Sequence, residues 1–403
     1  MLLSKKMLRS FAFFFKLLFR KKEYDVIFVN SVVFNRNDNG GNSLFQPFFE
    51  VCERLKLNYI IIEDADLKGE YKQFERNRDA IPFDFISLIS IILRKLFNKK
   101  ISKLNSLEKD IFISKILKRY FLYNLDSKIY ITLIWNKVTL WRLLSPEATV
   151  VDYQHGITMN GHKGYLLDGR PPAIKTFNNI TTLVFSNKIK KILINNDKTN
   201  FYNNENVITV GVNNELMNLS NIDKKIILFT LQLTPDFSKK INTNYIKTLR
   251  EIVNSILKHL EKNDYKIVLK HHPRYSDNFD LTFNHDFITI SDDNLEELLK
   301  KAKLHITFNS TSAIDAALLG IPSIFIDLQK EFSPKDIFFD QFHYPFDNLL
   351  IHSKDELAEA IGFIEYDYKY ISNKVYQWAN NLNNDFDKEK LKGFLMKKLN
   401  KNE

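Results

Sequence analysis

The sequence predicts an α/β protein made of two doubly wound, Rossmann-like domains facing each other across a cleft. Short runs of β-forming residues alternate with helical segments, and this alternation occurs twice along the 403 residues. A polar, asparagine-rich stretch at 211–224 separates the two occurrences. Polar side chains also gather where several strands end, in both halves. Because parallel sheets bind ligands at the carboxyl ends of their strands, this pattern predicts a ligand site in each half.

Composition excludes several protein classes. Cys52 is the only cysteine, so one chain can form neither a disulfide framework nor a cysteine-based metal site. No segment reaches the roughly 20 apolar residues that span a bilayer. The net charge of +10 favours contact with phosphates, nucleic acid or an anionic membrane surface. No nucleic-acid-binding module is recognisable, so we do not expect nucleic acid as a partner.

Residues 1–22 are predicted to form a basic amphipathic helix. Its apolar positions recur at helical spacing, namely Leu8, Phe11, Phe15 and Leu18. A signal peptide is not expected, because Lys16 interrupts the apolar stretch of sequence and no small-residue cleavage site follows. The helix is suited either to an anionic membrane surface or to packing on the protein's own surface. The first alternative predicts a cytoplasmic protein that is peripheral on the inner face of the cell membrane.

The first predicted domain covers residues 23–212 and begins with a strand, a loop and a helix. The loop at 30–42 contains Arg36 and Gly40-Gly41 but lacks the GxGxxG pattern, so a dinucleotide site is not indicated. Residues 83–125 have a helical pattern, and a further helix is expected around Trp135 and Trp141. The expected strands are Val26–Val29, Tyr59–Ile62, Ile129–Leu133, Thr149–Tyr153, Thr182–Phe185 and Val207–Val210.

The second predicted domain covers residues 224–365, and closing helices are expected over 366–403. Its long helix is expected at Ile241–Lys262 and a shorter one at Leu295–Lys301. The first expected strands are Lys225–Thr230, Lys266–Leu269 and Phe287–Ile290.

The segment Lys303–Asp327 is the most informative part of this domain. It reads as a strand, a cluster of polar residues at Asn309-Ser310-Thr311-Ser312, a short helix, Gly320 and Pro322, and a second strand. Backbone N–H groups at a helix start attract phosphate, and the three hydroxyls add donors. One such hydroxyl alone would be only a helix cap. With Asp315 one turn further on, the cluster predicts a nucleotide site.

Two further polar clusters follow strands. His271-His272-Pro273-Arg274 follows the second strand of the second domain, and His272 and Arg274 can donate to a diphosphate. Gln154-His155-Gly156 follows the fourth strand of the first domain. There His155 is placed to act as a general base. Asp152 is an alternative base, and a structural His155 bonded to the loop through His162 is another alternative.

The predicted site therefore has three parts. His155 is the expected catalytic residue. The expected acceptor contacts are Gln154, His162 and Arg36. The expected donor contacts are His272, Arg274, Ser310, Thr311, Ser312 and Asp315.

Metal binding is the rival interpretation of the histidines. His271 and His272 would point to opposite faces of an extended strand, so they cannot easily hold one ion. Neither HxxxH nor HExxH occurs. We therefore expect no metal site.

The segment Ser310–Ile326 resembles the donor-binding segment of GT-B glycosyltransferases. In that superfamily a hydroxyl cluster precedes an acidic residue, a short helix, Gly-x-Pro and a strand, and here Asp315 and Gly320-Ile321-Pro322 match that order. The acidic residue of the superfamily contacts the ribose, which by resemblance falls to Asp315. The three motifs together are similar to CDP-glycerol glycerophosphotransferases of teichoic acid synthesis and to capsule sialyl- and Kdo-transferases. The sequence QHGITMNGH lacks the Thr-Pro-Leu-Lys continuation of the former, and the chain lacks the acidic-acidic-Gly motif of several sialyltransferases.

This resemblance implies a glycosyltransferase of capsule, lipopolysaccharide or related surface polysaccharide synthesis. Its donor would be a nucleotide-sugar, such as a CMP- or UDP-sugar, used as substrate with no further cofactor. Its acceptor would be a glycan or a lipid-linked glycan. The alternatives are a polyol-phosphate transferase that uses a CDP-glycerol-type donor, a sugar-nucleotide 2-epimerase of the same fold, and a non-catalytic nucleotide or glycan binder.

Overall fold

The computed structural model describes residues 5–35, 40–67, 75–133, 138–156, 164–213, 224–233, 239–272, 281–283, 285–328 and 333–400. The chain forms two compact units, each with its own parallel sheet. The first unit comprises Met1–Asn214 and Asn384–Glu403, and the second comprises Glu215–Asn383. The predicted class of two doubly wound α/β units is confirmed.

The first unit contains a seven-stranded parallel sheet in the order β3-β2-β1-β4-β5-β6-β7. Its strands are β1 (Lys22–Asn30), β2 (Tyr59–Glu63), β3 (Ile81–Pro82), β4 (Leu125–Thr132), β5 (Thr149–Tyr153), β6 (Thr181–Val184) and β7 (Val207–Thr209). Its helices are α1 (Lys5–Leu17), α2 (Gln46–Arg54), α3 (Asp84–Leu96), α4 (Asn98–Ile101), α5 (Ser106–Leu117), α6 (Val138–Leu144), α7 (Ala173–Phe177), α8 (Asn187–Asn196) and α14 (Lys388–Leu399), with short turns η1 (Val32–Phe34) and η2 (Lys118–Leu122).

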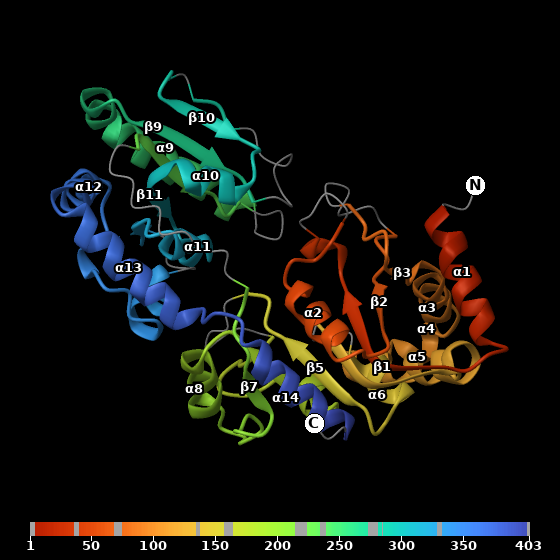
Figure 1. The fold of residues 1–403 in the computed structure, drawn as a ribbon. Coiled ribbons are helices and arrows are strands. Elements are labelled where there is room, and N and C mark those ends of the chain that lie inside the picture. Colours follow the sequence, from red (N-terminus) through yellow and green to blue (C-terminus); the bar gives the residue numbers. More distant parts are fainter. Residues whose placement is uncertain are drawn as a thin grey trace. The chain divides into compact units, whose positions relative to one another are not determined.

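Both faces of this sheet are buried. Along β1, Ile27 and Val29 point into one apolar core, whereas Val26 and Phe28 point into the other. Helices α1, α3, α5 and α6 contribute to the first core, and α2 and α14 contribute to the second. Figure 1 shows α2 and α3 on opposite sides of β1 and β2. The continuous apolar run Val26–Val29 of β1 is therefore explained by burial on two faces.

The second unit contains a six-stranded parallel sheet in the order β10-β9-β8-β11-β12-β13. Its strands are β8 (Ile226–Thr230), β9 (Lys266–Lys270), β10 (Ile288–Ser291), β11 (Ala302–Thr307), β12 (Ser323–Ile326) and β13 (Leu350–Ile351). Its helices are α9 (Lys239–Asn263), α10 (Leu295–Lys301), α11 (Ser312–Leu318), α12 (Leu357–Tyr366) and α13 (Tyr368–Leu382), with short turns η5 (Lys335–Gln341), η6 (Asp347–Leu349) and η7 (Lys354–Glu356).

The strand order reverses direction at one point in each sheet. In the first unit the reversal lies between β1 and β4, and in the second it lies between β8 and β11. Ligands of doubly wound folds bind outside the carboxyl ends of the strands at such a switch point. The two switch points are therefore the first places to examine for function.

The expected closing helices at 366–403 divide between the two units. Helix α13 packs against α11 in the second unit, whereas α14 packs against α2 in the first. Gly211, at φ +80°, lies against the backbone of Asp385, and a side chain there would collide with that backbone. Tyr153 donates a hydrogen bond to the carbonyl of Gly211 (2.8 Å). The segment around Asp385, which leads into α14, thus packs directly against the backbone that follows β7.

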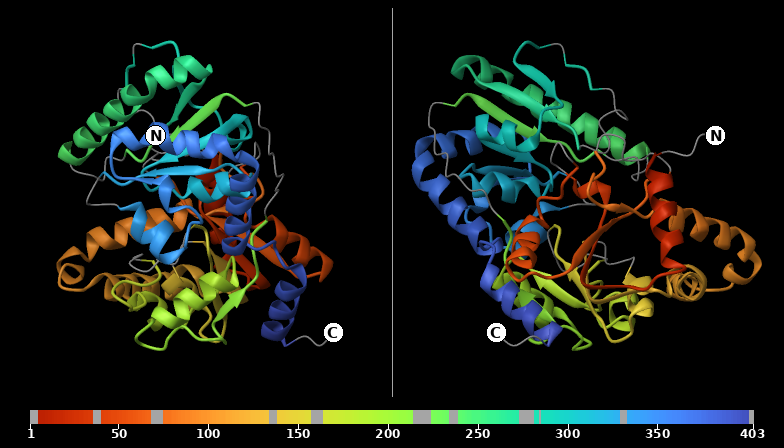
Figure 2. Two further views of the ribbon diagram at one scale, coloured as in Figure 1. Left: turned by 90° about the vertical axis from the view of Figure 1, so that its left-hand side faces the viewer. Right: turned by 45° about the vertical axis from the view of Figure 1, so that its right-hand side comes forward.

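The N-terminal helix α1 packs on its own unit through one face and leaves another face exposed. Phe14 and Leu17 are buried in the core, and Arg9 donates to the carbonyl of Ala80 (3.2 Å). Figure 2 shows α1 lying next to α3. Large apolar side chains remain exposed on its other face, namely Leu8, Phe11, Phe15 and Phe19. Among the described residues, no helix has the length and apolar character needed to cross a bilayer.

Candidate functional site

The hydroxyl cluster of the second unit lies at the switch point, as its sequence position predicts. Thr307 ends β11, and its hydroxyl accepts a hydrogen bond from the N–H of Ser310 (3.0 Å). The hydroxyl of Ser310 in turn accepts from the N–H of Ser312 (3.2 Å), at the first residue of α11. Gly320, at φ +71°, ends the turn after α11 and returns the chain to β12. The turn between β11 and α11 is therefore stabilised from within.

A buried, neutral network supports this turn. The imidazole of His305 is fully buried and contacts the hydroxyls of Thr230 (2.8 Å) and Ser323 (2.9 Å). Ser312 bonds Thr230 (2.9 Å) and Ser310 (2.8 Å) through its hydroxyl. Burial lowers the pKa of His305 to about 3, so the imidazole is neutral at physiological pH.

His305 is the residue that sequence reasoning missed. In the sequence it belongs to a short apolar run, where a single histidine is unremarkable. Its partners become visible only with the strand register, in which His305 lies opposite Ser323 and Thr307 lies opposite Thr230.

The predicted donor contacts differ in exposure. Ser310 is half-buried and Thr311 is exposed, whereas the Ser312 side chain is buried within the network. Asp315 is an exposed side chain on α11. Protein atoms around its carboxyl remove part of its hydration, and this desolvation raises the pKa of Asp315 to about 6.

The second donor motif follows β9, which neighbours β8 in the sheet. His271 is buried, and burial lowers its pKa. His272 is half-buried and lies at the same edge of the sheet as Thr230, because Lys270 and Thr230 are paired in the register. Arg274 lies outside the described residues. The structure thus brings His272 and the Ser310 turn to one edge of one sheet.

In the first unit, His155 follows β5. It is half-buried, and its ring centroid lies 4.9 Å from that of Phe34 in η1. Its Nδ1 has no hydrogen-bond partner within the described part of the chain. Burial lowers the pKa of His155, and the charge of Lys175 adds to that effect while Asp152 opposes it. A neutral imidazole is chemically able to accept a proton, although Nδ1 itself is a buried atom.

Asp152 is not a suitable alternative base. Its carboxylate accepts a 2.6 Å hydrogen bond from the ammonium of Lys175, and both side chains have no exposed surface. The Lys175 ammonium also lies 3.9 Å from the centroid of the Tyr165 ring. Because the pair is closed off from solvent, a substrate hydroxyl has no access to it. Burial lowers the pKa of Lys175, with Asp152 opposing the shift.

Gln154, a predicted acceptor contact, has both ends of its amide hydrogen-bonded within the protein. Its amide nitrogen donates to the carbonyl of Gly156 (2.7 Å), and its amide oxygen accepts from the N–H of Phe185 (2.8 Å). It therefore stabilises the backbone beside His155. The other two predicted acceptor contacts, Arg36 and His162, lie outside the described residues.

A buried charged network lies beyond the carboxyl ends of β1 and β2 in the first unit. Glu63, at the end of β2, receives hydrogen bonds from Arg76 (2.7 Å) and Asn35 (2.9 Å). Arg76 also donates to Asp84 (2.7 Å). Asn30, at the end of β1, accepts from Asn42 (2.7 Å) and donates to Asn35 (2.8 Å). Sequence reasoning missed this network because its members come from four separate loops and strand ends.

Among the described residues, no three His, Cys, Asp or Glu side chains lie together in a way that could hold a metal ion.

Comparison with known proteins supports the resemblance seen in the sequence. No curated protein matches this chain in sequence. Residues 202–326 match the model of one family, the capsule polysaccharide biosynthesis proteins. That segment runs from just before β7 of the first unit to the end of β12 and includes the whole Ser310 turn.

Solved structures show which fold the chain has. TagF, a wall teichoic acid polymerase, superposes with a TM-score of 0.56 at 13% identity, over 93% of this chain and 89% of TagF. UDP-GlcNAc 2-epimerase from Methanocaldococcus jannaschii gives a TM-score of 0.55 at 15% identity, over 93% of this chain and 100% of the epimerase. CalG4, the calicheamicin glycosyltransferase, gives 0.53 at 12% identity, over 94% and 99%. The chain has a GT-B-like fold.

Two further matching structures of TagF and of the epimerase were determined with nucleotide compounds. A TagF variant was soaked with CDPG, and the epimerase was solved in complex with UDP-GlcNAc and UDP. At such low identity these matches show the fold and leave the reaction of the present chain to be proposed.

Proposed function

We propose that this protein is a glycosyltransferase of capsule or related surface polysaccharide synthesis, which moves a sugar from a nucleotide-activated donor to a glycan acceptor. The observation that carries the proposal is the match of residues 202–326 to capsule biosynthesis proteins. That segment includes the turn with Ser310 and Thr311 at the switch point of the second unit. The GT-B-like fold is compatible with this activity.

The donor is proposed to bind at the switch point of the second unit. Its diphosphate would be bound by Ser310, Thr311, His272 and Arg274, and Asp315 would accept from the ribose hydroxyls. Ser312, whose side chain is buried, would contribute to donor binding by holding Ser310 in place.

In the proposed reaction, the acceptor hydroxyl oxygen forms a bond to the anomeric carbon of the donor sugar. The bond from that carbon to the donor phosphate oxygen breaks, and the nucleotide leaves with the bonding electrons. His155 takes the proton of the acceptor hydroxyl. Burial keeps its imidazole neutral and therefore ready to act as a base.

The test of His155 separates binding from chemistry. His155→Ala should leave nucleotide affinity near that of the wild type, while transfer falls by roughly a hundredfold or more. Calorimetry measures the first quantity, and product formation measures the second. A variant with unchanged turnover would remove His155 from the reaction.

Polyol-phosphate transfer is the second candidate, because TagF is among the matched structures and one TagF structure contains CDPG. Mass spectrometry of the acceptor product distinguishes the two reactions. A sugar adds no phosphorus to the acceptor, whereas a polyol phosphate adds one phosphate per unit. A 2-epimerase would change its nucleotide-sugar without any acceptor and without releasing nucleotide.

The exposed face of α1 is proposed to hold the protein on the inner surface of the cell membrane. Phe15 and Phe19 are 46% and 75% exposed, and Lys5, Lys6, Lys16 and Arg20 lie exposed on or beside the same helix. Apolar side chains flanked by basic ones suit an anionic interface.

Point substitutions test this membrane contact better than deletion of the helix, because α1 also fills the core of its unit. Phe15→Glu combined with Phe19→Glu should abolish sedimentation with vesicles that contain phosphatidylglycerol. Tyr366→Glu is the matched control, since Tyr366 is 92% exposed in the second unit. If the wild-type protein does not sediment with such vesicles at low salt, the membrane contact is excluded.

A further inference from the structure

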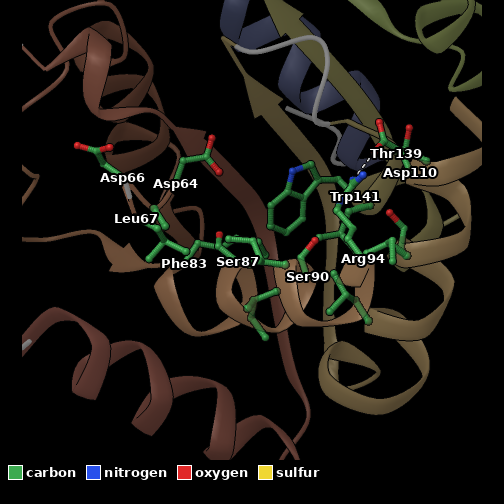
Figure 3. A pocket seen from close by; sticks show the side chains of 17 residues that line it. Asp64, Asp66, Leu67, Phe83, Ser87, Ser90, Arg94, Asp110, Thr139 and Trp141 are labelled. Atoms are coloured by element: carbon green, nitrogen blue, oxygen red, sulfur yellow. Dashed lines mark hydrogen bonds and ion pairs between the residues drawn. The ribbon is translucent and has the colours of Figure 1, made fainter. Parts of the chain in front are cut away.

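The first unit contains a cavity of about 440 Å³ that includes none of the predicted site residues. Figure 3 shows its lining from α3 and from residues next to β2. The cavity begins at Asp64, which directly follows β2, and continues between α3, α5 and α6. Its volume is within the range of small-molecule sites and exceeds that of a single water by far.

Apolar and polar groups occupy different parts of this cavity. In Figure 3, Trp141 lies between a pair of carboxylates, Asp64 and Asp66, and the ion pair of Arg94 with Asp110. That ion pair is 2.7 Å long. Ser87 and Ser90 of α3 add hydroxyls to the lining. The remaining lining is mostly aliphatic and aromatic, including Phe83, Ile113 and Leu140.

This lining disfavours one class of ligand and suits another. Three carboxylates and one guanidinium give the lining a net negative charge, which repels phosphates and nucleotides. A neutral saccharide avoids this repulsion. Its hydroxyls can donate to carboxylates, and its C–H face can cover the rings of Trp141 and Phe83.

One residue of the cavity lining, Asp64, lies at the same edge of the sheet as His155. Asp64 follows β2 and His155 follows β5, and both strands belong to one parallel sheet. Three strand spacings separate β2 from β5, which corresponds to roughly 14 Å. A glycan with its terminal hydroxyl at His155 must therefore extend over more than one sugar unit to reach the cavity.

We propose that this cavity is a second acceptor subsite, which binds a neutral sugar unit of the growing glycan away from the reacting end. This inference rests on the proposed transferase function, because it assumes that the glycan end lies at His155. The subsite gives the enzyme a means to prefer an extended glycan over a single sugar.

The test uses saturation-transfer NMR on the full-length protein with methyl glycosides of glucose, galactose, mannose and N-acetylglucosamine. Farnesol serves as the apolar probe. Ser90→Trp places a large side chain in the cavity, whereas Ile92→Trp places the same side chain on the exposed surface of the same helix. We expect a glycoside signal in the wild type that falls at least fivefold in Ser90→Trp and persists in Ile92→Trp.

Asp66→Asn provides a second variant that does not alter the cavity volume. It should weaken the same glycoside signal several-fold, because a neutral amide is a weaker acceptor for sugar hydroxyls. If no glycoside gives a signal that depends on the cavity, the proposal is wrong. If farnesol alone depends on Ser90, the cavity is a site for a lipid chain and the proposal is equally wrong.

Thermal shift with UDP, CDP and CMP on the same samples separates this inference from the proposed function. The Ser90→Trp variant should retain the nucleotide response of the wild type, because the donor motifs lie in the other unit. If the wild type gives no glycoside signal but keeps its nucleotide response, only the subsite proposal is contradicted. Absence of any nucleotide response in the wild type would instead count against the transferase function.

Discussion

The carboxyl ends of the two parallel sheets carry contrasting groups. In the first unit, Glu63, Arg76 and the asparagines around Asn30 form a buried network of charges and amides beyond β1 and β2. In the second unit, neutral hydroxyls surround His305, and the exposed Thr311 directly precedes α11. The polar groups of the first network thus bond to one another, whereas Thr311 of the second unit is exposed. A shared fold therefore does not imply a shared ligand site.

The largest effect is expected where the charged network is broken. Arg76→Met removes the only cation that is hydrogen-bonded to both Glu63 and Asp84 among the described residues. Two buried carboxylates would then lack a neighbouring cation. The free energy of unfolding should therefore fall by about 3–5 kcal/mol. Urea unfolding measures the loss, and hydrogen exchange should place it in the first unit.

Arg78 provides the matched control for that variant. It pairs with Glu75 at the surface, where both side chains are more than half exposed. Arg78→Met should therefore change stability by less than about 1 kcal/mol. Equal losses of stability in the two variants would show that the buried network contributes no more than the surface ion pair.

A smaller effect is expected from the neutral network, and it depends on pH. The folded protein holds the pKa of His305 at about 3, below its usual 6.5. The contribution of His305 to stability is therefore complete above pH 6.5 and is lost as the pH falls toward 3. Between pH 7 and pH 5 the loss is about 2 kcal/mol.

The comparison of wild type with His305→Gln isolates this contribution from other titrating groups. The stability difference between the two proteins should shrink by about 2 kcal/mol from pH 7 to pH 5, since glutamine does not titrate. Chemical unfolding at several pH values measures it. A constant difference would mean that His305 has the same pKa in the folded and the unfolded protein.

The smallest effect is expected from the exposed rim of the second switch point. Ser310→Ala removes one hydroxyl and should weaken nucleotide binding by about 1 kcal/mol, or roughly fivefold. Ser102→Ala, an exposed serine of the first unit, is the control and should leave the affinity unchanged. If Ser310→Ala changes the nucleotide affinity no more than this control does, the phosphates do not contact Ser310.

The sequence predicts features that depend on neighbouring residues. Gly320, Pro322 and the apolar runs around them define a strand, a helix and a strand locally, and the structure contains all three. Features that join distant residues were not predictable in this way. Lys175 and Asp152 are 23 positions apart, and Glu63 and Arg76 meet across a loop. Such pairs look like ordinary surface charges until the fold brings them together.

The candidate site also combines features that depend on neighbouring residues with features that join distant ones. Strand-end positions of Ser310 and His272 follow from local pattern, because every parallel strand ends at the same edge. Ser312 and Gln154 form hydrogen bonds to residues up to 82 positions away. The exposure of these two side chains could therefore not be inferred from their residue type.

The central claim is that the second switch point binds the nucleotide and the first does not. Calorimetry with UDP, CDP and CMP tests it most directly, using the full-length protein at pH 7.5, where the Asp315 carboxyl is ionised. We expect micromolar to millimolar binding of at least one nucleotide, weakened tenfold or more by Arg274→Ala combined with Asp315→Asn and unchanged by His155→Ala. Binding that survives the double substitution, or that is lost with His155→Ala, would contradict the account.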